Sequence, residues 1–469
     1  MIPLTLGEVA AAVRGRLVGV GDPGTQVTGT VEFDSRRVGP GGLFVALPGD
    51  RVDGHGFARA AVRAGAVAVL ASRPVDVPAV LVPDPRDALA LLATAVLDRL
   101  ADLTVVGITG SSGKTSTKDL VAHLVERLGP TVAPPGSFNN EIGHPHTVLR
   151  ADRGSRYLVL EKSARGLGHI AALCQIAPPR IGVVLNVGTA HLGEFGSRAA
   201  IASAKGELVE ALPAADRGGI AVLNADDPLV AAMAGRTAAR VVTTGVAEPA
   251  DLRAVGVRLD RSGRASYTLV GRGAEARVRL GLHGGHHVSN SLAAAAVAVE
   301  LGMSLPAVAA ALGQARPRSP RRMEVRDRVD GLTVINDSYN ANPESTGAAL
   351  RALAAMAGGR RSWAVLGQMA ELGPGSDAAH ERIGRLAAGL GVDRLVAVGA
   401  EAGHLHRGFV AGGSGGEESV HVPDVESAIT LVRQEVRPGD VVLVKASKVA
   451  ALWRVADALL AGGPAREIG

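Results

Sequence analysis

A glycine-rich segment near residue 110 has the residue types of a phosphate-binding loop. Residues 106–117 read VGITGSSGKTST, an apolar β-branched run followed by glycines at 110 and 113, Lys114 and Thr115. In such a loop, backbone N–H groups can surround phosphates, the lysine can reach the outer phosphates, and the hydroxyl can bind Mg²⁺. The pattern is TGxxGKT rather than GxxxxGK[ST], which argues against the commonest GTPases and motors. We expect ATP to bind Thr109, Gly110, Ser111, Ser112, Gly113, Lys114, Thr115 and Ser116.

Two residues with ligand chemistry follow apolar runs further along the chain. Glu161 ends the run YLVLE, and a carboxylate at the carboxyl end of a neighbouring parallel strand can bind Mg²⁺. An ordinary surface carboxylate is the alternative for Glu161. His191 follows the run PRIGVVLNVG, although Mg²⁺ prefers oxygen ligands and a single histidine is more often structural or exposed.

Lys205, in the small-residue segment IASAKGEL, is unusual for this chain. Only six of the 50 basic residues are lysine, so a site that needs an amine is one explanation for its presence. An amine can lose its proton in a protein and a guanidinium cannot. A neutral lysine can react with carbon dioxide to give a carbamate, which is an anionic oxygen ligand; a solvated lysine is the alternative.

The elements that must position these residues fall into three segments. Residues 1–101 combine short strands and helices with PGG, PGD and VDGHG turns. Residues 102–315 repeat strand, loop and helix, and the strands LTVVGIT, SRYLVLEKS, PRIGVVLNVG and GGIAVLNADD are apolar on both faces, which predicts a parallel sheet covered by helices. Residues 316–469 begin in the linker QARPRSPRRM and contain the strands LTVIND, RSWAVLG, DRLVAVG and DVVLVKAS, typical of a Rossmann-like domain; AGGSGGEES is expected to be a loop.

Composition narrows the functional classes. The chain has 469 residues, a net charge of +5 and 2% aromatic residues, with no long basic run, so nucleic acid is not expected as a partner. Cys174 cannot form an internal disulfide and is expected to be a small buried residue. No apolar run reaches the roughly 18–20 residues that cross a bilayer, and no secretory signal begins the chain, so we expect a cytoplasmic protein without membrane insertion.

Several motifs in order resemble the Mur ligases of peptidoglycan synthesis. These are TGSSGKT, the strand-ending LE, LNVGTAHL and SAKGEL. FDSRRVGPGGLFVALPGDRVDGHGF resembles the N-terminal domain of the tripeptide- and pentapeptide-forming members. FNNEIGHPHTVL, NDSYNANPES and VLGQMAELG are similar to motifs of the member that adds D-alanyl-D-alanine, and the DNPR stretch of the diaminopimelate-adding member is missing. The resemblance covers essentially the whole chain.

The resemblance implies a three-domain α/β enzyme: an N-terminal nucleotide-sugar domain, a central phosphate-loop ATPase domain and a C-terminal Rossmann-like domain. It implies that ATP phosphorylates the terminal carboxylate of UDP-N-acetylmuramoyl-tripeptide, and that the amine of D-alanyl-D-alanine attacks the acyl phosphate. The implied partners are these two substrates, and the implied protein is a monomer acting in cell-wall synthesis, cell shape and cell division. Alternatives are another Mur-type ligase, a phosphate-loop switch ATPase, and a non-catalytic binding protein that retains the fold.

The resemblance also implies site residues. Lys114, His191 and Lys205 are implied in catalysis. Thr115 and Glu161 are implied ligands of one Mg²⁺, with His191 and carbamylated Lys205 ligands of a second. The implied substrate contacts are Ser35, Arg36, Asp53, Gly54 and His55 for the uridine end, although a simple turn is the alternative, and Asn139 and Asn140 near the acyl group. The implied ATP contacts are His286, Asn290, Arg322, Asp337, Tyr339 and Asn340, with Asn342 beside them and Lys445 and Ser447 as closing residues.

Some positions depart from the family pattern. Lys162 follows Glu161, where relatives have Met or Leu, and the strand alternation predicts that it points away from the metal. SARGLGH replaces GANxxGE, while Gln368, Ala446 and Arg321 replace Asp, Gly and Gly respectively. None of these changes removes an implied metal ligand.

Overall fold

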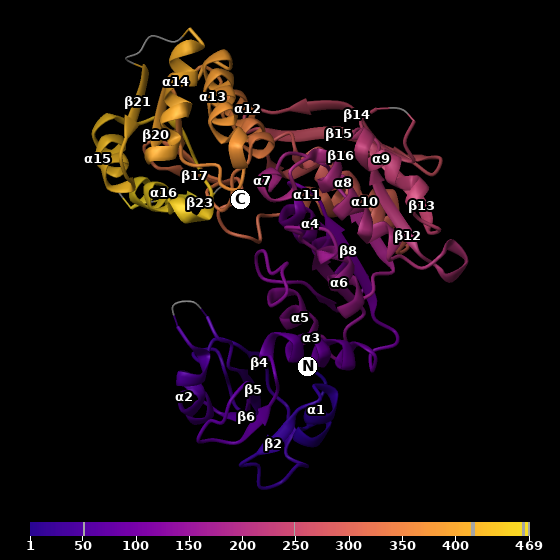
Figure 1. Ribbon diagram of the computed structural model, residues 1–469. Coiled ribbons are helices and arrows are strands. Elements are labelled where there is room, and N and C mark those ends of the chain that lie inside the picture. The colour runs from indigo at the N-terminus through magenta and orange to yellow at the C-terminus, as the bar shows by residue number, and fades with distance from the viewer. Residues whose placement is uncertain (50–51, 248, 414–417, 462–464, 468–469) are drawn as a thin grey trace.

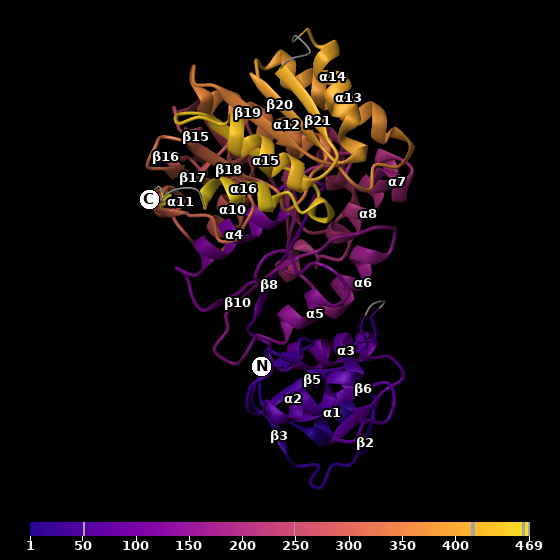
Figure 2. The same ribbon diagram turned by 90° about the vertical axis from the view of Figure 1, so that its left-hand side faces the viewer.

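Three β-sheets, each covered by helices, follow one another along the chain (Figures 1 and 2). The computed structural model describes residues 1–49, 52–247, 249–413, 418–461 and 465–467. The N-terminal sheet lies at one end of the molecule, and the central and C-terminal sheets lie side by side at the other. The predicted α/β class is confirmed. In the part of the chain that the structure describes, no helix combines the length and the apolar character that crossing a bilayer requires.

The N-terminal sheet has strand order β2-β7-β6-β5-β4 and is parallel except for β2. Its strands are β2 (Arg16–Val18), β4 (Val31–Glu32), β5 (Gly42–Val45), β6 (Ala66–Ala71) and β7 (Ala79–Leu81), with a separate pair β1 (Leu4–Thr5) and β3 (Gln26–Val27). The helices are α1 (Leu6–Ala12), α2 (Ala58–Arg63) and α3 (Pro85–Leu97).

The central sheet has strand order β16-β15-β14-β13-β12-β11-β8-β10-β9. The strands are β8 (Thr104–Thr109), β9 (Thr131–Val132), β10 (Tyr157–Glu161), β11 (Ile181–Val184), β12 (Ile220–Asn224), β13 (Arg240–Gly245), β14 (Leu252–Leu259), β15 (Arg264–Gly271) and β16 (Ala274–His283). The pairs from β9 to β14 are parallel as predicted, whereas β14, β15 and β16 form an antiparallel extension that was not predicted. Burial alternates along β15, as period-two patterning requires of a one-sided strand.

Helices cover both faces of the central sheet and form two apolar cores. On one face are α4 (Lys114–Val125), α10 (His287–Glu300) and α11 (Leu305–Gln314), and on the other are α6 (His169–Ile176), α8 (Arg198–Glu210) and α9 (Pro228–Ala231). Cys174 is a buried free cysteine of the second core, as expected. The short α5 (Gly143–Val148) packs on α3, so the core of the N-terminal sheet continues into the central one.

The C-terminal sheet has strand order β21-β20-β19-β22-β18-β17-β23, and its first five strands are parallel. The strands are β17 (Glu324–Arg328), β18 (Thr333–Asn336), β19 (Ser362–Leu366), β20 (Arg394–Val398), β21 (Ser419–Val422), β22 (Val441–Lys445) and β23 (Ala465–Glu467). Helices α12 (Pro343–Ala357), α13 (Ser376–Gly389) and α14 (Gly403–Ala411) cover one face, and α15 (Val425–Glu435) and α16 (Trp453–Leu460) the other. Residues 414–417 of the expected loop lie outside the described residues.

Candidate active site

The phosphate-binding loop joins β8 to α4. Strand β8 is flanked by β10 and β11, and all three are parallel, so their carboxyl ends meet at one edge of the sheet. Gly113, directly before α4, has φ +82, and a Cβ there would lie 2.5 Å from Oδ1 of Asn290. Asn186 closes the loop from β11, since its Oδ1 accepts the Ser112 backbone N–H at 2.9 Å. The backbone N–H groups at the start of α4 thus open onto the cleft beside this loop.

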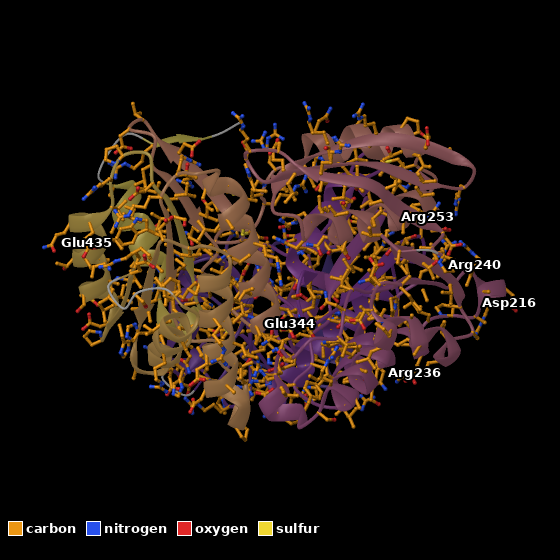
Figure 3. All side chains as sticks on the ribbon, turned by 90° about the horizontal axis from the view of Figure 1, so that it is seen from above. Asp216, Arg236, Arg240, Arg253, Glu344 and Glu435 are labelled. Carbon is orange, nitrogen blue, oxygen red and sulfur yellow. The ribbon has the colours of Figure 1, made fainter. Side chains whose placement is uncertain are left out.

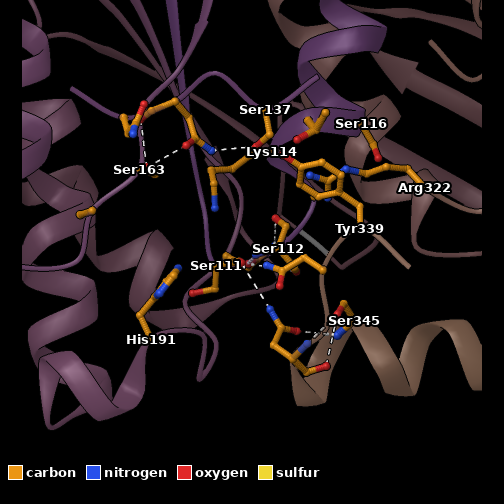
Figure 4. A pocket seen from close by; sticks show the side chains of 18 of the residues that line it. Ser111, Ser112, Lys114, Ser116, Ser137, Ser163, His191, Arg322, Tyr339 and Ser345 are labelled. Atoms are coloured by element: carbon orange, nitrogen blue, oxygen red, sulfur yellow. Dashed lines mark hydrogen bonds between the residues drawn. The ribbon is translucent and has the colours of Figure 1, made fainter. Parts of the chain in front are cut away.

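A cleft of about 1050 Å³ lies between the central and C-terminal sheets (Figure 4). It brings together most of the predicted ATP and acyl-group residues. Those lining it are Ser111, Ser112, Gly113, Lys114, Thr115, Ser116, Asn139, Asn140, His191, His286, Asn290, Arg322, Asp337, Tyr339, Asn340, Asn342 and Lys445. The lining does not include Thr109, Gly110, Glu161, Lys205 and Ser447, nor the predicted uridine contacts.

Lys114 and Glu161 are the charged residues at the phosphate-binding loop. Nζ of Lys114 donates to the Gly110 carbonyl at 2.5 Å, and burial lowers the pKa of Lys114 to about 8, a shift that the Glu161 carboxylate opposes. Glu161 is fully buried, and its Oε2 accepts from Ser137 and Asn139 at 3.3 and 3.2 Å. Its Oε1 is buried, and none of the residues that the structure describes forms a hydrogen bond with it. A buried carboxylate oxygen left unpaired is costly, and it fits a cation ligand.

Lys205 lies in α8 and is 5% exposed. No described residue forms a hydrogen bond or an ion pair with its amine. Burial, and then the Lys114 ammonium, hold the pKa of Lys205 well below its usual value. Both effects favour the neutral amine, which is the form that reacts with carbon dioxide.

His191 contacts a residue that the sequence did not single out. Its Nδ1 lies 2.6 Å from Oε2 of Glu371, which comes from the loop after β19, and the carboxylate lies off the direction of an aligned N–H donor. Burial lowers the pKa of His191, Glu371 raises it, and Lys114 and Lys205 lower it further. His191, Glu194 and Glu371 together offer ligand atoms within 4.8 Å of one another. Glu371 lies within the quoted motif VLGQMAELG, which was the available signal.

A second carboxylate from the C-terminal side was also missed. Glu344, in the first turn of α12, accepts from the backbone N–H and hydroxyl of Thr189 at 2.8 and 3.0 Å. Figure 3 shows Glu344 at the seam between the two sheets. Asn342 crosses the same seam, with its Nδ2 3.5 Å from the Ser111 carbonyl. These contacts bring the C-terminal side against the phosphate loop.

The opposite wall of the cleft is cationic and aromatic. The guanidinium of Arg322 lies over the Tyr339 ring at 4.3 Å from its centroid, as Figure 4 shows. Nζ of Lys445 is 2.6 Å from a carboxylate oxygen of Asp337, so these two predicted residues pair with each other. Burial lowers the pKa of His286, whose Nδ1 has no hydrogen-bond partner within the described part of the chain. This wall combines a planar ring with positive charge, which suits a nucleotide.

The predicted uridine contacts lie on the N-terminal sheet and make a turn there. Asp53 accepts from the His55 backbone N–H at 3.0 Å, and its Oδ1 lies 2.6 Å from Nδ1 of the same histidine. A Cβ on Gly54 would lie 2.7 Å from Leu47 backbone atoms. Arg36 is exposed and paired with Asp34 at 2.7 Å, and Ser35 lies beside it. These contacts account for the turn, and a substrate role for these residues remains a prediction.

Lys162 points away from Glu161, in the direction predicted from strand alternation. Its Nζ donates to the carbonyls of Leu173 and Ala177 at 2.9 and 3.1 Å and lies 3.0 Å from Nε2 of His144. Burial lowers the pKa of Lys162 to about 8. The side chain thus ties the end of β10 to α6 and α5.

Replacing Lys162 by methionine should remove a pH dependence of stability. The pKa of Lys162 is about 8 in the folded chain, against 10.5 for an ordinary lysine, which is the value we take for the unfolded chain. Between these values the unfolded chain holds one more proton than the folded chain, so the free energy of unfolding rises with pH, by up to about 3 kcal/mol. Urea titrations from pH 7 to pH 10.5 should show this rise in wild type relative to Lys162→Met. Parallel curves for the two proteins would contradict it.

Family models match along the chain. The Mur ligase family catalytic domain matches residues 27–97, the Mur ligase middle domain residues 108–298, and the Mur ligase glutamate ligase domain residues 321–448. The chain is 54% identical, over 98% of both chains, to the UDP-N-acetylmuramoyl-tripeptide--D-alanyl-D-alanine ligase of Mycobacterium tuberculosis (strain ATCC 25618 / H37Rv). It is 36% identical to the ligase of the same name from Escherichia coli (strain K12), over 99% of this chain and 100% of that one.

Solved structures agree with the sequence relatives. MurF from Acinetobacter baumannii superposes with a TM-score of 0.86 at 30% identity, covering 97% of this chain and 98% of that one. MurF ligase from Thermotoga maritima in complex with ADP gives a TM-score of 0.78 at 32% identity, covering 92% and 97%. The chain belongs to the Mur ligase family. The resemblance and the predicted class of enzyme, a ligase, are confirmed.

Proposed function

We propose that this chain is the ATP-dependent ligase that joins D-alanyl-D-alanine to the terminal carboxylate of UDP-N-acetylmuramoyl-tripeptide, forming an amide bond. The products are the UDP-linked pentapeptide, ADP and phosphate. The observation that carries the proposal is 54% identity, over 98% of both chains, to a ligase of that name. The role extends to peptidoglycan synthesis and hence to cell-wall biogenesis, cell shape and division, in the cytoplasm and as a monomer.

The proposed organisation has three domains. Residues 1–101 hold the uridine end of the acceptor, with Ser35, Arg36, Asp53, Gly54 and His55 as its contacts. Residues 102–315 bind ATP and carry the chemistry, and residues 316–469 close over the nucleotide. The separation of the three sheets supports these limits, since β7 ends at Leu81, β8 begins at Thr104, β16 ends at His283 and β17 begins at Glu324.

The proposed reaction begins at the phosphate loop. Backbone N–H groups and Lys114 hold the ATP phosphates, and Arg322, Tyr339 and Asn340 hold the nucleotide from the other wall. The acceptor carboxylate then attacks the γ-phosphorus and ADP leaves, which requires the two anions to meet nearly in line. The amine of D-alanyl-D-alanine attacks the acyl carbon, and phosphate leaves as the amide forms. Water excluded from the cleft cannot hydrolyse the acyl phosphate.

The proposed metal residues are Thr115 and Glu161 at the nucleotide end, and His191 and carbamylated Lys205 at the acyl end. The unpaired Oε1 of Glu161 and the unpartnered amine of Lys205 support this assignment. Mg²⁺, when bound there, neutralises negative charge on the phosphate oxygens. Lys114 adds a positive charge beside the same oxygens.

The test is phosphate release from ATP with the UDP-linked tripeptide, adding either D-alanyl-D-alanine or D-alanine, together with the mass of the product. We expect release and a pentapeptide only with the dipeptide. Phosphate release at a rate that depends on neither the UDP-linked tripeptide nor the amine substrate would favour a switch ATPase. Activity with a single amino acid on a shorter acceptor would favour another Mur-type ligase.

A further inference from the structure

Two tight turns from different sheets touch beside the cleft. His191, before α7 (Leu192–Phe195), has φ +62, and Glu371 on the C-terminal side has φ +65. The Gly193 N–H donates to the Glu371 carbonyl at 3.3 Å, and a Cβ on Gly373 would lie 2.6 Å from the Gly193 Cα. Non-glycine residues in this backbone region are uncommon, and they cluster where a fold holds a side chain for a purpose.

The side chains at this junction contact one nitrogen of His191 and leave the other open. Nδ1 faces Glu371 at 2.6 Å, and Nε2 has no hydrogen bond with any described residue. Arg165 lies 3.6 Å from the other oxygen of Glu371, and Glu194 lies 3.9 Å from Nδ1. Arg165 belongs to the segment SARGLGH, which departs from the family pattern. The carboxylate of Glu371 is therefore held between a cation and the imidazole.

The loop that carries Glu371 is fixed by buried groups of its own sheet. Nε2 of His380, which is fully buried, accepts the Met369 N–H at 2.9 Å. The Ser447 hydroxyl accepts the Ala370 N–H at 2.9 Å. Glu371 follows directly, so its position is set by the C-terminal sheet, whereas the position of His191 is set by the central sheet. Their contact exists only when the two sheets are docked.

We propose that Glu371 is a positioning residue for the ligation reaction: on docking of the C-terminal sheet it engages Nδ1 of His191 and turns Nε2 toward the reacting groups. A carboxylate 2.6 Å from one imidazole nitrogen orients the ring, and a turn of the ring that brings the N–H into line with it fixes the tautomer. Chemistry is thereby coupled to closure, because His191 is correctly set only in the closed enzyme. This inference rests on the proposed function.

The test compares Glu371→Gln with Glu344→Gln. Both remove a charged contact across the same seam, but Glu344 contacts Thr189 and not His191. Turnover is measured against ATP and Mg²⁺ concentration. Mn²⁺ binding is measured by electron paramagnetic resonance with a non-hydrolysable ATP analogue and the UDP-linked tripeptide, and closure by small-angle scattering.

We expect Glu371→Gln to lower kcat by about 10- to 100-fold, with the KM for ATP changed less than about twofold. Its Mn²⁺ affinity should fall by a similar factor at one of two sites, and Glu371→Asp should restore part of both losses. Glu344→Gln should weaken closure and leave Mn²⁺ affinity unchanged in the closed fraction. Failure of wild type to make pentapeptide would refute the proposed function, while the Mn²⁺ and scattering contrasts would still test the positioning.

Three outcomes would overturn the inference. Wild-type kcat and Mn²⁺ binding in Glu371→Gln would show that His191 does not need the carboxylate. If kcat falls equally in both variants while Mn²⁺ affinity stays unchanged, then Glu371 only helps the two sheets to dock and does not position His191. Loss of Mn²⁺ binding in Glu371→Gln without any nucleotide or substrate would make Glu371 a direct ligand.

Discussion

Replacing Lys205 by arginine is expected to lower the rate of ligation by about 10³-fold while the chain keeps its fold. Arginine supplies a positive charge on a side chain of similar length, so activity would survive the change if Lys205 acted only as a cation. A guanidinium does not deprotonate in proteins and cannot form a carbamate. A decrease of this size is typical when an enzyme loses one pre-organised group that stabilises charge developing in the transition state.

The environment of Lys205 is the physical reason for this expectation. The amine is buried, and the ammonium of Lys114 nearby disfavours a second positive charge. Its pKa therefore lies well below the ordinary value, which favours the neutral amine that carbon dioxide requires. A carbamate would place a negative charge beside the ammonium of Lys114.

The measurement pairs kinetics with detection of the modification. Wild type equilibrated with ¹³C-bicarbonate should show a carbamate resonance that Lys205→Arg lacks, and removal of carbon dioxide should slow wild type reversibly. Thermal unfolding and ADP binding serve as controls for the fold. A fully active Lys205→Arg variant would eliminate the carbamate role.

Much of the central sheet and its loop could be predicted because their determinants are local. Apolar runs on both faces identify buried parallel strands, and neighbouring parallel strands end at one edge. Hence Glu161 and the loop bearing His191 lie on either side of the strand that leads to Lys114. The antiparallel strands β14–β16 could not be predicted from continuous apolar runs, because a strand with one exposed face, such as β15, alternates in burial.

Contacts across the seam could not be predicted in the same way. Glu371 and Glu344 lie in segments whose motifs were noted, but their partners His191 and Thr189 come from another sheet. Asp337 and Lys445 were each predicted at the site, and their mutual pairing was not. Such pairings depend on how two sheets dock, and this docking is a tertiary property that local patterns do not encode.

Replacing Glu161 by glutamine is expected to abolish most activity without destabilising the chain. The carboxylate is fully buried, and its Oε1 has no hydrogen-bond partner among the described residues, so this unpaired oxygen is costly to the fold when no cation is bound. Glutamine keeps an acceptor for Ser137 and removes that charge, so the free energy of unfolding should stay constant or rise slightly. Ligation should fall by about 10²- to 10³-fold, because charge at the phosphates is no longer matched.

The opposite directions of the two effects distinguish a functional carboxylate from a structural one. Glu161 also raises the pKa of Lys114, so Glu161→Gln should lower that pKa further below its present value of about 8. Activity, the free energy of unfolding and Mn²⁺ affinity are measured on one preparation, by kinetics, by urea unfolding without nucleotide and by Mn²⁺ titration. Matching losses of stability and activity would show that the carboxylate serves the fold. Stability maintained while activity and Mn²⁺ affinity fall together would mean that the fold tolerates a strained charge because the reaction needs it.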